Sequence, residues 1–272
     1  MSSRRRFGQH FLVNRGVVDR IVEAAELSGD DVVLEIGPGK GALTEPLVAS
    51  GQRVVALEID RDLVAEFPPA LTEAESFTLV EADANRADWR SVLPSLDGAR
   101  VKLLSNLPYE SSSPLIVRYL ETSLRDDSFD LAVLMMQLEV AQRLAAEPGS
   151  KNHGSLAALA RATHSIETVV DVSPGSFRPP PKVQSRVLRL RPLERPLLAA
   201  DEHAGYAAFL RLAFSQRRKQ LAGLLHGNGG LDREGWSAQL RRLGHPPTVR
   251  AEALSPEELV ALFRQSVLET TS

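Results

Sequence analysis

The chain alternates short apolar segments rich in β-branched residues with longer segments of helical periodicity, from residue 17 to residue 190. This order is typical of an α/β fold, in which a largely parallel sheet carries helices on both faces. We predict one sheet of seven strands, at Val32–Ile36, Arg53–Glu58, Phe77–Glu81, Val101–Ser105, Leu131–Met135, Thr168–Val172 and Val183–Leu190. Helices are expected near residues 17–27, 42–49, 60–66, 114–124 and 138–146.

A different pattern begins at the end of this region. Only a Pro-rich loop separates the last two predicted strands, so we expect them to pair antiparallel at one edge of the sheet. The sequence RPLERPLL, which follows, is interpreted as a linker. Three helical patterns come after it, the first over residues 201–225, with Asp201, Asp232 and Ser255 as the residues that mark their starts. We predict an α/β domain over residues 1–192 and a small all-helical domain over residues 193–272.

The chain has no cysteine, which excludes disulfide scaffolds, thiolate zinc sites and every mechanism with a cysteine nucleophile. Methyl transfer to C5 of a pyrimidine is excluded with them, because it usually proceeds through a cysteine adduct. The six histidines lack metal-ligand spacing, so no metal is predicted. No run of 18 apolar residues is present, and the N-terminal MSSRRRFGQHFL lacks the apolar core of a secretory signal. We expect a cytoplasmic, monomeric protein with no membrane partner.

The net charge of −3 hides a strong asymmetry along the chain. Residues 21–176 carry 25 acidic and 12 basic side chains, whereas residues 177–250 carry 14 basic and 5 acidic ones. The first 20 residues are also basic, with a net charge of +4. Such asymmetry indicates a polyanionic partner, although a solvated charged face is the commoner cause of a single run. Charge alone therefore leaves nucleic-acid binding and a solvated surface equally open.

The segment VVLEIGPGKGALTEPL runs from a predicted strand through a glycine-rich turn into a predicted helix. Gly37, Gly39 and Gly41 permit a tight turn and let a ligand approach the backbone at a helix N-terminus. This is typical of a nucleotide-type pocket at the carboxyl edge of a parallel sheet. The cofactor remains open, because Gly37, Gly39 and Ala42 also match the dinucleotide pattern G-x-G-x-x-G/A. A bare strand-to-helix turn is the alternative without a ligand.

Acidic residues at strand ends bear on the choice of cofactor. Glu58 ends the second strand, where a carboxylate can accept both hydroxyls of a ribose, in nicotinamide and S-adenosylmethionine enzymes alike. Glu35, two residues before Gly37, and Asp83, just after the third strand, favour S-adenosylmethionine. A cofactor with a sulfonium and an ammonium group but no pyrophosphate belongs among carboxylates, since these offset its positive charge. A turn-capping role is the structural alternative for Asp83.

The sequence NLPY follows the fourth predicted strand. An exocyclic amine on a base is a poor nucleophile, because its lone pair is delocalised into the ring. The side-chain oxygen of Asn106 and the main-chain oxygen of Leu107 can accept its hydrogens and favour the charge that develops as it attacks a methyl group. Pro108 fixes the turn, and Tyr109 offers a ring on which a flipped-out base can stack. A strand-ending turn with a packed tyrosine is the alternative, but four strand ends that converge on one pocket favour a site.

Five motifs together resemble those of a known family: RFGQHFL (6–12), EIGPGKGALT (35–44), NLPY (106–109), FRPPPKVQS (177–185) and FSQRRKQL (214–221). In this order, over nearly the whole chain, they are similar to the KsgA/RsmA family of small-subunit ribosomal RNA adenine N6,N6-dimethyltransferases. The resemblance implies a Rossmann-like class I methyltransferase sheet and S-adenosylmethionine as the cofactor. It also implies dimethylation of two adjacent adenosines near the 3′ end of 16S rRNA in the small ribosomal subunit, and a role in the biogenesis of that subunit.

The resemblance further implies roles for single residues. Phe177 would be the second aromatic ring of a base sandwich opposite Tyr109, and a core phenylalanine is the alternative. Asn106 would touch both the cofactor and the target. Contacts with the cofactor are implied for His10, Leu12, Glu35, Gly37, Gly39, Glu58, Asp83 and Asn106. In the helical domain, two basic clusters would grip RNA phosphates, with a solvated helix face as the alternative for each: Arg217, Arg218 and Lys219, and Arg241 with Arg242.

The chain departs from the family pattern at His10, where many relatives have asparagine, at Lys40, and over Glu110–Ser113, where a more apolar stretch is usual. Leu138 and His153 also differ. Three other functions stay open at this point. The first is a large-subunit rRNA adenine N6-methyltransferase of the macrolide-resistance type, and the second is a non-catalytic assembly factor with a vestigial pocket. The third is a nicotinamide oxidoreductase, for which no hydride-handling residue is found.

Overall fold

The computed structural model describes residues 9–109 and 111–268, and the chain divides into two compact units. The first contains the chain up to Ala141 together with Ile166–Pro192, and the second contains Gln142–Ser165 together with the chain from Leu193. The chain passes from the first unit to the second after Pro192, and Gln142–Ser165 belongs to the helical unit rather than to the sheet. This segment carries helix α8 (Ser155–Arg161), whose residues Ala157–Ala160 are buried and which contacts helix α9 (His203–Ala213) of the same unit.

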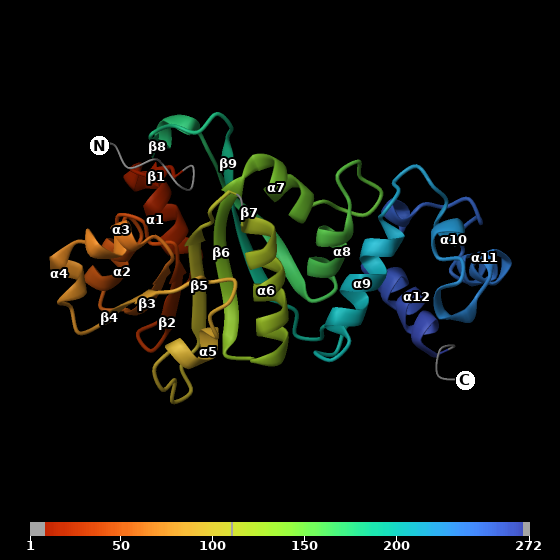
Figure 1. The fold of residues 1–272 in the computed structure, drawn as a ribbon, viewed down its shortest axis with the longest axis horizontal. Coiled ribbons are helices and arrows are strands. Elements are labelled where there is room, and N and C mark those ends of the chain that lie inside the picture. Colours follow the sequence, from red (N-terminus) through yellow and green to blue (C-terminus); the bar gives the residue numbers. More distant parts are fainter. Residues whose placement is uncertain (1–8, 110, 269–272) are drawn as a thin grey trace. The chain divides into compact units, whose positions relative to one another are not determined.

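The first unit is built on a mixed sheet of seven strands in the order β4-β3-β2-β5-β6-β9-β7 (Figure 1). Five strands run parallel, and β9 is antiparallel to β6. All seven predicted strands are present: β2 (Val32–Ile36), β3 (Arg53–Glu58), β4 (Phe77–Glu81), β5 (Val101–Asn106), β6 (Phe129–Gln137), β7 (His164–Val172) and β9 (Ser185–Pro192). The predicted edge pair is β9 with β7, which are neighbours in the sheet. Arg186 forms an ion pair with Asp171, and Arg189 forms one with Glu167. Residue numbers rise along β9 as they fall along β7, which is the order of an antiparallel pair.

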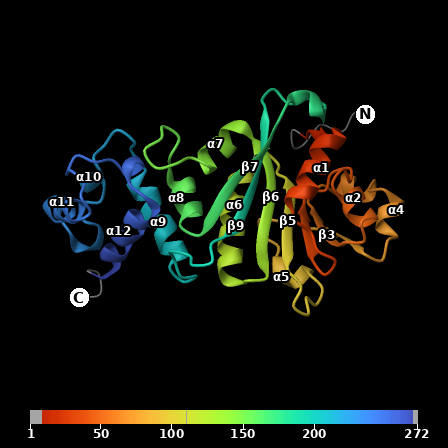
Figure 2. The same cartoon turned by 180° about the vertical axis from the view of Figure 1, so that it is seen from behind.

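Helices cover both faces of this sheet. Helix α1 (Arg15–Ala24) begins at Asn14, whose side chain accepts a hydrogen bond from the backbone N–H of Val17. Its buried residues Val17, Val18, Ile21 and Ala24 recur at helical spacing and pack into the core with Val33 and Val133 of the sheet. Helix α6 (Ser112–Arg125) lies in front of β6 in Figure 1, and α1 lies toward the viewer in Figure 2. The other helices of this part are α2 (Thr44–Ala49), α3 (Arg61–Ala65), α4 (Pro69–Thr72) and α5 (Trp89–Val92), and α7 (Leu138–Leu144) begins in it and continues into the second unit.

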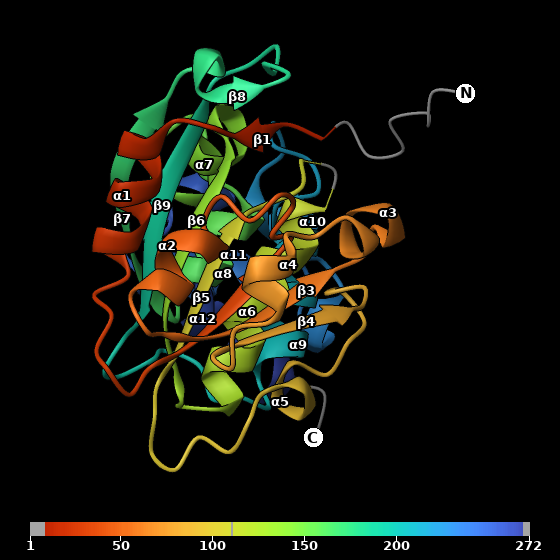
Figure 3. The same cartoon turned by 90° about the vertical axis from the view of Figure 1, so that its left-hand side faces the viewer.

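Two short strands that the sequence does not predict join distant parts of the first unit. Strand β1 (Phe11–Leu12) pairs antiparallel with β8 (Phe177–Arg178), and Figure 3 shows the two side by side. The pair matches Leu12 with Phe177, and both side chains belong to the core. This pairing holds the N-terminal arm against the segment that precedes β9.

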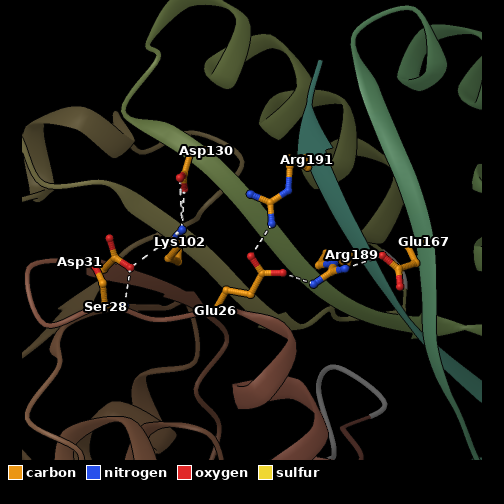
Figure 4. A network of polar contacts seen from close by, with 8 residues as sticks. All are labelled: Glu26, Ser28, Asp31, Lys102, Asp130, Glu167, Arg189 and Arg191. Carbon is orange, nitrogen blue, oxygen red and sulfur yellow. Dashed lines mark hydrogen bonds and ion pairs between the residues drawn. The ribbon is translucent and has the colours of Figure 1, made fainter. Parts of the chain in front are cut away.

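A network of charged side chains lies at the amino ends of β5 and β6, the opposite edge from the glycine loop (Figure 4). The Lys102 ammonium is 3.0 Å from Asp130 and 3.9 Å from Asp31, and its side chain is only 7% exposed. Glu26, which follows α1, forms ion pairs with Arg189 and Arg191 of β9. A buried charge costs much free energy unless it is paired, so the network ties these strands to the loop before β2.

The second unit is helical: α8, α9 (His203–Ala213), α10 (Leu221–Leu224), α11 (Arg233–Arg242) and α12 (Pro256–Leu268). Asp232 and Ser255 cap α11 and α12 as predicted, and Ser255 forms a reciprocal capping box with Glu258. The prediction that Asp201 marks a helix start is wrong, because α9 begins at His203. The predicted continuous helix over residues 201–225 is also wrong. The chain leaves the helical conformation between the end of α9 at Ala213 and the start of α10 at Leu221. At the start of α10, the backbone N–H of Leu221 donates to the main-chain oxygen of Val249.

Candidate active site

A cavity of about 330 Å³ lies at the carboxyl ends of four parallel strands of the first unit. Each strand end contributes a segment to its wall, and the N-terminal arm contributes Gln9–Leu12. In open α/β sheets this edge is where ligands bind. The wall segments after β2, β3, β4 and β5 are Glu35–Lys40, Leu57–Ile59, Ala82–Asn85 and Asn106–Tyr109. Eleven of the twelve predicted active-site residues line this cavity, and Phe177 is the exception.

The glycine loop follows β2 with backbone angles that favour glycine. Gly37 and Gly39 have φ values of 68° and 59°, in the left-handed region. A Cβ atom at residue 39 would lie 3.3 Å from the ring of Phe11, and the Gly37 N–H donates to the oxygen of Leu57 at 2.9 Å. The loop is thus anchored to β3, and its backbone borders the cavity closely. This is the cradle that the glycine pattern predicts.

Two buried carboxylates stand beside the glycine loop. Burial raises the pKa of Glu35 to about 7, against the opposing effect of the Thr44 hydroxyl, which donates to it at 2.7 Å; the nearby Glu58 raises the pKa further. Burial also raises the pKa of Glu58, although the backbone N–H groups of Asp60, Gly39 and Ile59 donate to its carboxylate and act in the opposite direction. A cationic ligand would favour the ionised form of both groups.

The loop after β4 presents Asp83 to the same cavity. One oxygen of its carboxylate accepts the backbone N–H of Asn85 at 2.9 Å, and Arg86 lies 3.6 Å from the other. The turn-capping role that the sequence leaves open is therefore present. It coexists with a position on the cavity wall, because each carboxylate oxygen can accept a further hydrogen bond from a ligand.

Asn106, the last residue of β5, is held by the N-terminal arm. Its side-chain nitrogen donates to the main-chain oxygen of His10 at 3.3 Å, which leaves the side-chain oxygen as the atom that can accept from a ligand. The backbone N–H of Leu107 donates to the oxygen of Met135 in β6 at 2.9 Å. The two acceptors expected for an amine, the side-chain oxygen of Asn106 and the main-chain oxygen of Leu107, therefore belong to residues whose backbone the sheet fixes.

Tyr109 is the aromatic wall of the cavity. Its hydroxyl lies 3.0 Å from that of Ser185, and burial raises its pKa, opposed by this hydrogen bond. The His10 ring packs against it with centroids 5.5 Å apart, and His10 Nδ1 lies 2.8 Å from the oxygen of Pro179. His10 was predicted to lie over the cofactor, and its ring also supports the aromatic wall.

Phe177 does not face this cavity. Its side chain is fully buried in the core, and its strand pairs it with Leu12, which favours the core phenylalanine of the alternative interpretation. Phe11, Ser185 and Pro179 also contribute to the site, although the sequence does not predict their contacts. Ser185 and Pro179 lie within the motif FRPPPKVQS, which is the signal that points to them. Glu110 lies outside the described residues.

The predicted RNA-binding residues of the second unit differ in their surroundings. Arg217 donates to the oxygen of Lys151 and to Glu252 at 3.0 Å, and Arg241 pairs with Glu234 at 2.8 Å. Arg242 donates to Gln239. The exposed residues Arg218 and Lys219 line an open groove together with Gln216, Gln220, Gly223, Leu224, His226 and Arg233.

Over residues 9–109 and 111–268, no group of three or more His, Asp and Glu side chains is placed to hold a metal ion. In the same part of the chain, no helix has the length and apolar character needed to cross a bilayer.

Comparisons with known proteins agree with this geometry. The model of the family described as ribosomal RNA adenine dimethylase matches residues 1–261. The protein named ribosomal RNA small subunit methyltransferase A of Geobacter metallireducens is 40% identical over 263 residues, which cover 96% of this chain and 94% of that protein. The protein of the same name from Syntrophotalea carbinolica is 41% identical over 255 residues, 94% of this chain and 93% of its own length.

Solved structures agree as well. A dimethyladenosine transferase from Plasmodium falciparum matches with a TM-score of 0.77 and 27% identity, over 96% of this chain and 98% of its own. The 23S rRNA methyltransferase ErmE matches with a TM-score of 0.69 and 27% identity, over 94% of this chain and 98% of its own. The predicted class I methyltransferase fold is thereby confirmed. The chain belongs to the ribosomal RNA adenine dimethylase family.

Proposed function

We propose that this protein transfers methyl groups from S-adenosylmethionine to N6 of two adjacent adenosines near the 3′ end of 16S rRNA in the small ribosomal subunit. The observation that carries the proposal is the position of Asn106, whose amide nitrogen is taken by His10 and whose oxygen is left as an acceptor on the wall of an acidic cavity. Family membership removes the nicotinamide oxidoreductase from the alternatives. We further propose that the protein acts in the cytoplasm as a monomer.

The carboxylates and glycines that line the cavity suit a cationic cofactor such as S-adenosylmethionine. When bound, this cofactor supplies a methyl group activated on a positively charged sulfur. Gly37 and Gly39 admit it close to the backbone, and Glu58 would accept its ribose hydroxyls. The carboxylate of Glu35 would offset the charge of the cofactor's ammonium group, and Asp83 would accept a hydrogen bond from the adenine amine. His10 and Leu12 of the arm would close over it.

The target amine would be held by this chain's own oxygens. Asn106 and Leu107 each offer one acceptor, so an unmodified amine can use both of its hydrogens. A monomethylated amine still has one hydrogen, which it can donate to one of these two oxygens. The same nitrogen can therefore be held for a second methyl transfer. Tyr109 would stack on the flipped-out adenine, and that contact is worth roughly 1–3 kcal/mol.

The basic residues of the second unit would bind the RNA backbone. Arg218 and Lys219 are exposed on a groove and suit phosphates, each of which steepens the salt dependence of binding by about one unit. Arg217, Arg241 and Arg242 would assist from positions where they also contact neighbouring side chains.

Methylation of isolated ribosomal subunits tests the proposal. Small and large subunits that lack dimethyladenosine are incubated with the protein and S-adenosylmethionine, and their rRNA is digested and analysed by mass spectrometry. We expect two methyl groups on each of two adjacent adenosines of the small subunit. Methylation of the large subunit alone would support a methyltransferase of the macrolide-resistance type. The similarity to the 23S rRNA methyltransferase ErmE is the observation that favours this alternative. No methyl gain in either subunit would contradict an enzymatic function and favour the assembly factor.

A further inference from the structure

One arginine of α6 grips the loop that carries Asp83. Arg118 donates from both terminal nitrogens of its guanidinium, to the main-chain oxygens of Asn85 and Ala87. Its central carbon lies 5.0 Å from the centre of the Trp89 ring, a cation–π contact. One side chain of α6 therefore makes three contacts with the segment from β4 to α5.

The same loop is shaped by contacts of its own. The Trp89 indole N–H donates to the oxygen of Ala84 at 2.8 Å. The main-chain oxygen of Asp83 accepts the backbone N–H groups of Arg86 at 2.9 Å and Ala87 at 2.8 Å. These bonds fix the shape of the loop, but they all lie within it. Arg118 belongs to a different element, so its hydrogen bonds fix the position of the loop relative to α6.

The position of the loop matters because Asp83, Ala84 and Asn85 form part of the cavity wall. Helix α6 reaches the same cavity through Leu115, one turn before Arg118. A hydrogen bond from a ligand amine to a carboxylate requires a donor–acceptor distance near 2.8 Å, so a shift of about 1 Å in the loop removes it.

We propose that Arg118 is a positioning residue that holds the Asp83–Ala87 segment and thereby sets the selectivity of the cofactor site for a 6-amino purine. This inference rests on the proposed function. A guanidinium suits the role because its planar fork reaches two carbonyl oxygens while its face stacks on an indole. Lysine offers a single ammonium and can satisfy one of the two oxygens at best.

Binding calorimetry with two ligands tests the role. S-adenosylhomocysteine carries the 6-amino group, and S-inosylhomocysteine carries an oxygen in its place. We expect the wild type to prefer the first, because a carboxylate accepts from an amine and repels a carbonyl. In Arg118→Met, affinity for S-adenosylhomocysteine should fall about tenfold while that for S-inosylhomocysteine stays nearly unchanged, so the preference shrinks. The preference of Arg118→Lys for S-adenosylhomocysteine should lie between those of the wild type and Arg118→Met. This variant keeps the positive charge, so it also serves as a control should Arg118→Met fail to fold.

A matched control lies on the same helix. Arg125 is two turns further along α6 and pairs with Glu121 at 3.1 Å. Arg125→Met removes the same charge from the same helix but keeps the contacts of Arg118 with Asn85, Ala87 and Trp89, so both affinities should stay at the wild-type values.

Trp89 provides a second readout, because the chain has only two tryptophans. In a Trp236→Phe background the emission reports on Trp89 alone. Adding Arg118→Met should change this emission in the absence of ligand and weaken its response to S-adenosylhomocysteine, whereas adding Arg125→Met should do neither.

The outcomes separate this inference from the proposed function. Equal losses of affinity for both ligands in Arg118→Met would indicate a merely structural role and overturn the inference, and so would an unchanged preference. If the wild type binds S-adenosylhomocysteine but does not prefer it, the inference fails while the methyltransferase function stands. If the wild type binds neither ligand, the proposed function fails first.

Discussion

The side-chain nitrogen of Asn106 donates to the main-chain oxygen of His10, 96 residues earlier in the chain, at 3.3 Å. The N-terminal arm thus orients the amide that would hold the target amine. Because the arm also lines the cavity, closure of the site and orientation of Asn106 depend on one segment, Gln9–Leu12.

Replacing Asn106 should separate catalysis from cofactor binding. Asn106→Ala removes one acceptor for the amine, and we expect the rate of methyl transfer to fall by about 10²–10³-fold, as for a lost donor in an oxyanion hole. Affinity for S-adenosylhomocysteine should fall far less. Single-turnover methylation and calorimetry measure the two effects, with the exposed Asn152→Ala as the control. Retention of the wild-type rate would refute the role of Asn106.

Glu35 should make stability depend on pH. Its pKa is raised from 4.5 to about 7 in the folded protein, so the folded state binds a proton that the unfolded state has lost between these values. The free energy of unfolding should therefore fall as the pH rises through this window, by about 3 kcal/mol from this group alone. Denaturant unfolding of the wild type and Glu35→Gln at several pH values isolates the effect. Parallel stability curves for the two proteins would contradict it.

Gly39 should be required for both backbone and ligand reasons. Gly39→Ala forces a side chain into a φ of 59° and places its Cβ 3.3 Å from Phe11, so we expect a loss of about 1–2 kcal/mol in stability and weaker binding of S-adenosylhomocysteine. Gly51→Ala is the control, since φ there is 82° with no atom within 4 Å of the new Cβ. The control should lose stability and keep its affinity; a loss of affinity in both would indicate a general effect.

Arg217 and Arg218 should differ although they are adjacent. Arg218→Gln removes an exposed charge from the groove, and the slope of log affinity for small subunits against log salt should drop by about one. Arg217→Gln breaks the contacts with Lys151 and Glu252, so it should also lower the melting temperature. Filter binding across a salt series and thermal unfolding separate the two. A destabilised Arg218→Gln would show that this side chain has a structural role.

The residues that sequence reasoning placed correctly depend on neighbours close in the chain. The strand Val32–Ile36, the glycine loop after it and the capping box of Ser255 with Glu258 are each specified within a few residues. Local preferences of this kind are visible in composition and spacing, and the carboxyl edge of a parallel sheet then brings Glu58, Asp83 and Asn106 together.

Long-range packing decided what the sequence left open or misplaced. Phe177 is buried because its strand pairs with Leu12, 165 residues away, and the helical unit takes Gln142–Ser165 because α8 finds its apolar partner in α9. Arg118 reaches the Asp83 loop from a helix whose own sequence gives no sign of that contact. Sequence by itself determined the elements and the chemistry at the strand ends. Only the tertiary structure decided which side chains meet, because those contacts join segments whose separation along the chain leaves no periodic or local signal.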